Sequence, residues 1–316
     1  MLNTQLEESW VFSTQINMSD QEKITFLKRK ANDIRISIIE MLVEAKSGHT
    51  AGPLGMTDIF TALYFEVLKH DPKKPDWPER DKLILSNGHI CPVLYATMAH
   101  AGYFPLSELM TLRKFGSRLQ GHPHREFMPF LENSSGPLGS GLSQAVGMAL
   151  ADRMAAGRSQ TSNSERGQTS RFIYCLMSDG EQDCGNTWEG AMLAGKEKLT
   201  NLIGVIDRND IQIDGFTHDI MPLEPLADKW RAWNWRVIEI DGNNMEEILK
   251  GFEEAKRSDL KSEERSDLGK PTVIIAKTIP GKGVPAFENK FEWHGKPPTK
   301  EEGEMALEEL RMMNKE

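Results

Sequence analysis

Cysteine is scarce in this chain of 316 residues, which carries only Cys91, Cys175 and Cys184. Three cysteines without metal-ligand spacing predict neither a disulfide framework nor a zinc site, and they fit a reducing compartment such as the cytosol. Long apolar runs are also missing, because no window reaches the roughly eighteen apolar residues that a membrane-spanning helix needs. The N-terminus has neither a basic start nor an uninterrupted apolar core. We therefore expect a cytoplasmic protein without a membrane segment.

Positive charge is in deficit, since 38 Lys and Arg residues stand against 47 Asp and Glu residues and give a formal net charge of −9 at pH 7. This balance provides no bulk attraction for a polyanion, so neither nucleic acid nor an acidic membrane surface is expected as a partner. A Ser/His/Asp arrangement and a Gly-x-Gly-x-x-Gly dinucleotide turn are absent as well. Any anionic ligand would have to be bound by a local site.

The chain does contain a regular alternation of apolar, β-branched strands and amphipathic helices. Strands are expected over 82–86, 172–177, 202–206, 235–240 and 272–277. Ser19 and Glu22 have capping-box spacing and predict a long helix to Ala45, and further helices are expected over 56–68 and 243–256. The alternation predicts an α/β fold with a single doubly wound, mostly parallel sheet flanked by helices. We expect residues 1–18 to form an N-terminal arm and residues 19–316 to form one domain.

The segment 171–215 contains the strongest indication of a binding site. Its two expected strands are followed by Asp179 and Asn209, which lie 30 residues apart with a helical segment between them. Parallel strands joined by a right-handed crossover bring their carboxyl ends together in the crevice where open sheets bind ligands. Carboxylate and amide oxygens suit Mg²⁺ or Ca²⁺. Gly180 and the helix that begins near Gly185 present backbone N–H groups to a phosphate, so these residues predict a metal-bound diphosphate.

Four of the eight histidines lie in glycine-containing loops that follow secondary-structure elements, which is where α/β domains assemble their sites. They are His49 in SGHTAGPLG, His89 in SNGH, His122 in GHP and His294 in WHGK. The segment GPLGSG, residues 136–141, precedes another expected helix and offers backbone donors to a diphosphate or a polar ring. Together these loops favour a site over a set of unrelated surface residues.

These motifs resemble the transketolase family over residues 20–300, most strongly in DRNDIQIDG, SGH, DKLILSNGH and KFEWHGK. The resemblance implies thiamine diphosphate and a divalent metal, Mg²⁺ with Ca²⁺ or Mn²⁺ as alternatives. It implies transfer of a two-carbon ketol unit from a ketose phosphate to an aldose phosphate. By the same resemblance, the metal ligands are Asp179, Asn209 and the main-chain carbonyl of Ile211.

The resemblance also implies roles for the loop residues. His49 and His294 would hydrogen-bond the sugar hydroxyls and move protons at the acceptor side, and His122 would hold the C1 hydroxyl of the donor. Besides the metal ligands, the cofactor-binding residues would be His89, lying against the diphosphate, Gly136, Leu138, Gly180 and Glu189, the last as part of a carboxylate network at a subunit contact. The family pattern is altered at Thr50, where proline is usual, at Asn87 and Pro280, where some members have lysine, and at Cys184, where glutamate is common.

The resemblance covers only the first half of an ordinary transketolase. The pyrimidine-binding domain, with the glutamate that activates the aminopyrimidine, belongs to the other half. We therefore expect the N-terminal subunit of a split transketolase that acts on sugar phosphates. Its partner would be a separate C-terminal, pyrimidine-domain subunit, and the simplest assembly is an α2β2 heterotetramer.

Three other interpretations stay open at the level of sequence. One is the α subunit of another two-chain thiamine enzyme, of the 2-oxo acid dehydrogenase type, which would release CO₂ from a 2-oxo acid. The second is a non-catalytic binding or assembly protein, as the residues at 178, 184 and 280 hint. The third is an ordinary Mg²⁺-dependent phosphate enzyme. The sequence also leaves open which ketose and aldose phosphates are used.

Overall fold

A five-stranded parallel sheet forms the centre of the computed structural model, which describes residues 18–158, 171–257 and 269–314. The strand order is β1-β2-β3-β7-β6, and every neighbouring pair is parallel. The strands are β1 (Lys82–Leu85), β2 (Ile173–Ser178), β3 (Leu202–Arg208), β6 (Arg236–Asp241) and β7 (Thr272–Lys277). The expected α/β fold with a parallel, helix-flanked sheet is confirmed. The expected N-terminal arm lies outside the described residues except for Met18.

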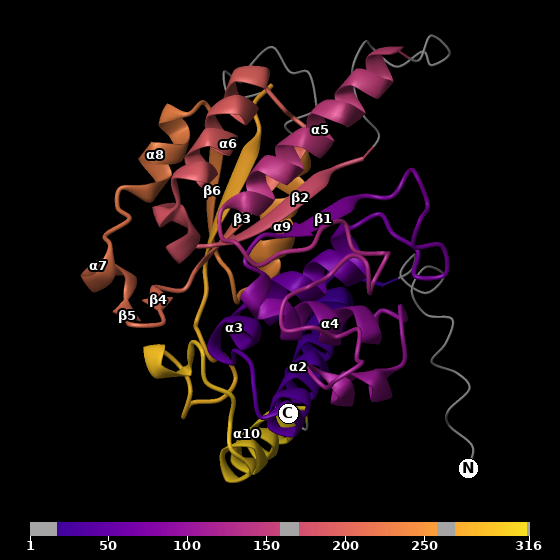
Figure 1. Cartoon of the computed structure of the whole chain (residues 1–316), viewed down its shortest axis with the longest axis vertical. Coiled ribbons are helices and arrows are strands. Elements are labelled where there is room, and N and C mark those ends of the chain that lie inside the picture. Colours follow the sequence, from indigo (N-terminus) through magenta and orange to yellow (C-terminus); the bar gives the residue numbers. More distant parts are fainter. Residues whose placement is uncertain (1–17, 159–170, 258–268, 315–316) are drawn as a thin grey trace.

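Helices cover both faces of this sheet (Figure 1). One face carries α5 (Ser140–Arg158), α6 (Gly185–Glu197) and α8 (Leu226–Ala232), and the other carries α2 (Asp20–Ala45), α3 (Ala51–Ala62), α4 (Cys91–His100) and α9 (Met245–Lys256). Successive residues of a strand point to opposite faces. Tyr174 of β2 therefore packs into one core while Cys175 packs into the other, and all six residues of β2 are buried. Strands buried on both faces explain why the sequence shows continuous apolar runs here.

The long first helix begins as the sequence predicts. The Ser19 hydroxyl accepts a hydrogen bond from the Glu22 N–H (3.3 Å), and the Glu22 carboxylate accepts one from the Ser19 N–H (2.8 Å), which completes the capping box. The expected start of the next helix at residue 56 is wrong, because α3 begins at Ala51 and continues into a π-helical turn over Leu63–Val67. Pro53 lies in the first turn of α3, where a missing N–H costs nothing.

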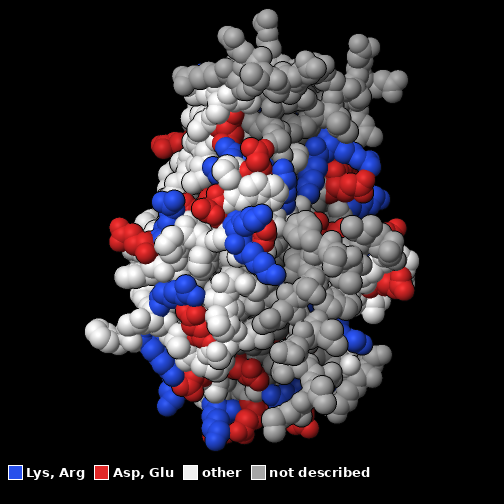
Figure 2. Space-filling model, turned by 90° about the vertical axis from the view of Figure 1, so that its right-hand side faces the viewer, with Lys and Arg blue, Asp and Glu red and all other residues white. Residues whose placement is uncertain are grey.

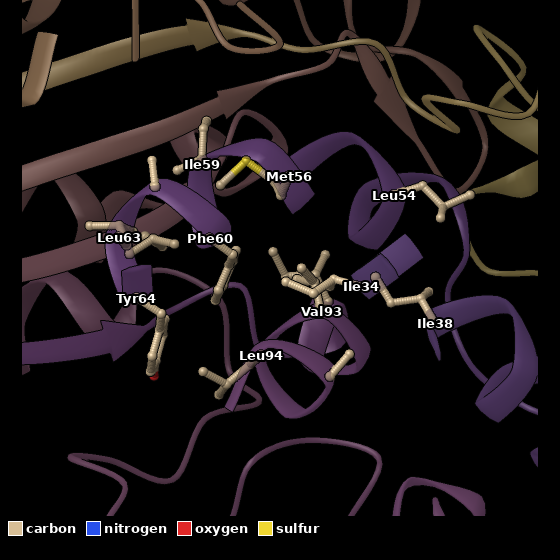
Figure 3. Close-up of a cluster of buried hydrophobic side chains, with 14 of the residues drawn as sticks. Ile34, Ile38, Leu54, Met56, Ile59, Phe60, Leu63, Tyr64, Val93 and Leu94 are labelled. Carbon is tan, nitrogen blue, oxygen red and sulfur yellow. The ribbon is translucent and has the colours of Figure 1, made fainter. Parts of the chain in front are cut away.

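A dense apolar core fixes α3 between α2 and α4 (Figure 3). The side chains labelled there come from all three helices and the π-helical turn, and they are Ile34, Ile38, Leu54, Met56, Ile59, Phe60, Leu63, Tyr64, Val93 and Leu94. Each is buried to within a few per cent of its surface. Such packing holds the amino end of α3 in place, and with it the loop that carries His49.

Several short elements connect the strands and the long helices. A hairpin of β4 (Ile211–Gln212) and β5 (Gly215–Phe216) follows β3 and leads into α7 (Thr217–Ile220). Short 3₁₀ turns occupy Gly88–Ile90, Leu106–Thr111, Gly180–Asp183 and Phe291–Trp293, labelled η3, η4, η5 and η7.

The last helix, α10 (Lys300–Met313), packs against α2, where Asn32 donates to the carbonyl of Leu310 (2.7 Å).

Charges of both signs are interspersed on the described part of the face shown in Figure 2. Among the residues that the structure describes, no helix is long and apolar enough to cross a membrane.

Candidate functional site

Asp179 and Asn209 lie beside each other at the carboxyl ends of β2 and β3. The register pairs Ser178 with Asp207, and the Asp179 N–H donates to the carbonyl of Asp207 (3.1 Å). The Asp179 carboxylate accepts hydrogen bonds from the N–H groups of Gly180 (2.7 Å) and Asp210 (2.8 Å). The parallel pairing thus brings together the two residues that the sequence places 30 positions apart and predicts as oxygen ligands.

The two buried carboxylates at this strand end, Asp179 and Asp207, would be stabilised by a nearby positive charge. Burial raises the pKa of Asp179 to about 6, although the guanidinium of Arg208, 3.0 Å away, opposes this rise. Burial also raises the pKa of Asp207 to about 7, against the hydroxyl of Thr278 and the amide of Asn209, which donate to it. A desolvated carboxylate becomes more stable in its ionised form when a cation binds beside it.

The amide of Asn209 is oriented by its neighbours. Its Nδ2 donates to Asp207 (2.8 Å), and its Oδ1 accepts from the N–H of Ile211 (3.1 Å), which begins the β4–β5 hairpin. No group of three or more His, Cys, Asp and Glu side chains in the described ranges could hold a metal ion. A cation at this strand end would therefore depend on amide and main-chain oxygens beside Asp179, which is the ligand chemistry of Mg²⁺ and Ca²⁺.

The glycine-rich loop before α5 packs tightly against two neighbours. At Gly139, whose φ is +79°, a Cβ would lie 2.1 Å from Oδ1 of Asn186 at the start of α6. A Cβ at Gly141 would lie 2.4 Å from Cβ of Ser86 in the loop after β1. Gly136 differs, because a Cβ there would meet no protein atom within 4 Å, and Leu138 is 37% exposed. The loop is therefore fixed at its carboxyl end and open at the residues predicted to contact a ligand.

Three of the four predicted histidines form a cluster. The ring centroids lie 5.0 Å apart for His49 and His89, 5.3 Å for His89 and His294, and 5.5 Å for His49 and His294. The loops of His49 and His294 are joined because the Thr50 hydroxyl donates to the carbonyl of Lys296 (2.6 Å). The hydroxyl at position 50 thus has a structural partner in this chain.

His122 lies at the edge of this cluster. A Cβ at Gly88 would lie 3.2 Å from its Cδ2, so His122 borders the loop that carries His89. Its side chain is exposed, unlike those of the other three histidines. The structure therefore brings all four predicted histidines to one region, with His122 on the side that faces out.

The clustered histidines are neutral at pH 7. Burial lowers the pKa of His49 and His294 to about 4, and the neighbouring His294 and Arg113 lower that of His49 further. Burial likewise holds the pKa of His89 well below its usual range. A neutral imidazole has one N–H donor and one acceptor nitrogen, so these rings suit the recognition of hydroxyl groups.

These lowered pKa values predict that stability falls with acid. The unfolded chain protonates histidine near pH 6.5, whereas the folded chain protonates His49 only near pH 4. Between these values the unfolded state binds more protons, so the free energy of unfolding decreases as the pH falls, by up to about 3 kcal/mol for one such residue. In urea titrations at pH 7 and pH 5, a His49→Asn variant should lose less stability than the wild type.

Comparison with the wild type cancels the opposite contribution of Asp179 and Asp207, whose raised pKa values favour the folded state at lower pH. A His49→Asn variant as acid-sensitive as the wild type would contradict the assignment of a buried, neutral His49.

Unpaired buried polar atoms surround the cluster. Neither Nδ2 nor Oδ1 of Asn87 has a hydrogen-bond partner, and the same holds for Nδ1 of His49 and Oγ of Ser135. A Cβ at Gly88 would lie 2.3 Å from Oγ of Ser135, which places Ser135 beside the same loop. Buried polar groups are rarely left unpaired because the loss costs about 1–3 kcal/mol each. These atoms fit a polar ligand that would complete their hydrogen bonds.

Glu189, predicted at a subunit contact, lies on the surface of this single chain. Glu189 is exposed on α6, and no hydrogen bond joins it to the other described residues of the site. Conversely, the sequence prediction did not assign Asp207, Arg208, Glu181 and Asn87, which lie beside the predicted residues. Asp207 and Arg208 belong to the motif DRNDIQIDG and Asn87 to SNGH, whereas Glu181 is marked in the sequence only by its adjacency to Gly180.

Comparison with known proteins shows one consistent similarity. Residues 27–315 match the family model described as the transketolase, thiamine diphosphate binding domain. A 6-deoxy-6-sulfo-D-fructose transketolase subunit of Clostridium sp. (strain MSTE9) is 42% identical over 293 residues, which cover 93% of this chain and 98% of that relative. An apulose-4-phosphate transketolase subunit of Phocaeicola vulgatus is 36% identical over 91% of this chain and 95% of that relative.

Solved structures show the same similarity. The transketolase of Campylobacter jejuni superposes with a TM-score of 0.80 at 34% sequence identity, over 94% of this chain and 43% of that one. The chain thus spans nearly the full length of the two subunit relatives but less than half of the solved protein.

Proposed function

Because the chain belongs to the transketolase family, matched over its thiamine diphosphate binding domain, we propose that it is the N-terminal subunit of a two-chain transketolase. The observation that carries this proposal is the joint presence of the Asp179–Asn209 strand ends and the histidine cluster on this fold. The reaction would move a two-carbon ketol unit from a ketose phosphate to an aldose phosphate. The free cysteines favour a cytosolic location.

The second half of the active site would come from a partner chain. The two relatives that share this chain's length are named as subunits, whereas the longer transketolase includes a further portion. We propose that the assembly is an α2β2 heterotetramer and that the partner is a C-terminal, pyrimidine-domain subunit. Sedimentation of the purified pair would measure this stoichiometry directly.

The residues present fit a metal-bound diphosphate. Asp179, Asn209 and the carbonyl of Ile211 would hold Mg²⁺, or Ca²⁺ or Mn²⁺ in its place, since all three supply hard oxygen ligands. Backbone groups at Gly136, Leu138 and Gly180 would receive the diphosphate, with His89 and the unpaired Asn87 beside it. When bound, thiamine diphosphate supplies the electron sink that allows a ketose carbon–carbon bond to break.

The chain's own histidines would handle the sugar. Neutral His49 and His294 can each donate to one hydroxyl and accept from another, so they would bind the sugar hydroxyls and move protons between them. The exposed His122 would hold the C1 hydroxyl of the donor. Burial around His49, His89 and His294 limits access of water to these rings.

Gly136 provides a sharp test of the proposed cofactor contact. Since a Cβ at this position meets no protein atom within 4 Å, Gly136→Ala should leave the stability of the cofactor-free chain unchanged. A methyl group that intrudes on a bound ligand should nevertheless weaken binding of Mg²⁺–thiamine diphosphate by about tenfold, the equivalent of about 1.4 kcal/mol. Calorimetry with the assembled pair measures this, and Gly147→Ala, which also meets no protein atom on α5, is the control. Unchanged affinity in Gly136→Ala would remove Gly136 from the cofactor site.

The proposed function is tested with the assembled pair of chains. The assay would mix the pair, Mg²⁺ and thiamine diphosphate with xylulose 5-phosphate, fructose 6-phosphate, apulose 4-phosphate or 6-deoxy-6-sulfo-D-fructose as donor and an aldose phosphate as acceptor. We expect ketol transfer from at least one donor. Release of CO₂ from a 2-oxo acid without ketol transfer, or no heat on calorimetry with Mg²⁺ and the coenzyme, would overturn the proposal.

A further inference from the structure

Glu181 is a fully buried carboxylate in the turn that follows Asp179. It lies in η5, and its relative exposure is 0%. Its carboxylate oxygens point to neither Arg208 nor the histidine cluster, because their hydrogen bonds all join other groups. A buried carboxylate persists only where donors compensate its loss of hydration, so its partners show what it does.

Those partners come from two loops and the end of a strand. Oε1 of Glu181 accepts from the hydroxyl of Ser86, in the loop after β1, and from the N–H of Gly139, in the loop before α5. Oε2 accepts from the N–H of Ser178, at the end of β2 (3.2 Å). Each donor lies within three residues of a predicted cofactor-binding residue, respectively His89, Leu138 and Asp179.

A further bond closes this network. The hydroxyl of Ser86 also accepts from the N–H of Gly141 (3.0 Å), so Ser86 and Glu181 hold the glycine-rich loop at two points. The glycine-rich loop is also tightly packed, because a side chain at Gly139 would overlap Asn186 and a side chain at Gly141 would overlap Ser86. The loops therefore depend on one carboxylate for their relative placement.

We propose that Glu181 is a positioning residue that holds the loops of His89, Leu138 and Asp179 together in the geometry that receives the metal-bound diphosphate. This inference rests on the proposed function. Burial raises the pKa of Glu181, and the donors from Ser86, Gly139 and Ser178 oppose the rise, which is consistent with a carboxylate held by its hydrogen bonds. In Glu181→Gln, the amide would turn an N–H₂ group toward at least one of three donors, and that bond would be lost.

Glu181→Gln in the assembled pair tests the inference. We expect the dissociation constant of Mg²⁺–thiamine diphosphate, measured by calorimetry well below each melting temperature, to rise at least tenfold. Turnover at saturating coenzyme should stay within about threefold of the wild type, because Glu181 itself touches no reacting atom. Ser86→Ala should produce a smaller change in the same direction, and the double variant should be no worse than Glu181→Gln, since both remove one network.

Asp81 offers a matched control at the opposite end of the sheet. It is also a buried carboxylate, precedes β1, and accepts from the N–H groups of Lys69 (2.9 Å) and Phe172 (2.7 Å). Asp81→Asn should lower the unfolding midpoint but leave the coenzyme affinity unchanged. Equal loss of affinity in Asp81→Asn and Glu181→Gln would reduce Glu181 to a general stability role and overturn the inference.

The remaining outcomes separate this inference from the function itself. If the wild-type pair binds the coenzyme and both Glu181→Gln and Ser86→Ala bind it equally well, only the positioning role is overturned. If the wild-type pair binds none, the proposed function fails and the inference fails with it. Should Glu181→Gln not fold, the affinity of Ser86→Ala decides the question.

Discussion

Replacing Asp179 by asparagine should abolish the dependence of this chain's stability on metal and coenzyme. The substitution keeps the size of the side chain but removes its negative charge, and metal–ligand interactions of this kind contribute several kcal/mol. We expect at least about a hundredfold weaker binding of Mg²⁺–thiamine diphosphate and a comparable loss of ketol transfer. A ligand present at 100 times its dissociation constant stabilises the folded state by about 2.7 kcal/mol. Thermal unfolding of the pair with and without both ligands would show that this increment disappears.

The cofactor-free variant should remain folded. Burial raises the pKa of Asp179 to about 6, so ionising this carboxyl costs more in the folded chain than in the unfolded chain, and an uncharged amide avoids that cost. Asp183→Asn, an exposed acid on the same turn that accepts from Gln212 (3.1 Å), should behave as the wild type. If Asp179→Asn retained the full ligand-induced shift in melting temperature, the proposed metal site would be wrong.

Purified alone, the chain should show no ketol transfer, and adding the pyrimidine-domain subunit should restore it. Only the family's thiamine diphosphate binding domain is matched here, and the chain spans 43% of a full transketolase structure. The activating glutamate is expected on the other chain, so its absence should reduce turnover to the level of the uncatalysed reaction. A titration of the partner at fixed chain concentration should reach a plateau at one partner per chain.

Addition of the partner with its activating glutamate replaced by glutamine is the natural control for that experiment. It should assemble with the chain without restoring turnover. Ketol transfer by the isolated chain, at a rate that a second chain does not increase, would refute a site shared between two polypeptides.

The sheet could be predicted from the sequence because its strands are buried on both faces. The strand over 272–277 is observed with the predicted limits, the strand predicted over 172–177 lies one residue later, and the strand predicted from 202 begins there but ends two residues beyond the predicted 206. The start of α3 was missed because Gly52, Pro53 and Gly55 suggest a loop. Packing outweighs that propensity, since the chain at Gly55 lies so close to Ile279 that a Cβ would approach its carbonyl oxygen to 2.9 Å.

The part of the candidate site that lies at strand ends could be predicted from the sequence. The part that depends on residues far apart along the chain could not. Parallel pairing alone brings Asp179 and Asn209 together, and the glycine-containing loops indicated the four histidines. Glu181 could not be identified in this way, because its donors Ser86 and Gly139 lie 95 and 42 residues away along the chain. The cofactor and substrate roles of all these residues stay predictions until the variants above are measured.

The bond between Thr50 and Lys296 has a consequence for kinetics. It joins two segments that lie 246 residues apart in sequence, and the N–H of Gly281 adds a second bond to the carbonyl of Ala51 (2.9 Å). His49 and His294 are therefore held together before any ligand binds, so a sugar bound there as proposed would not have to order them. Any lag phase after mixing should consequently reflect the docking of the two chains. The lag should shorten as the subunit concentration rises, and it should not change with the concentration of the acceptor aldose.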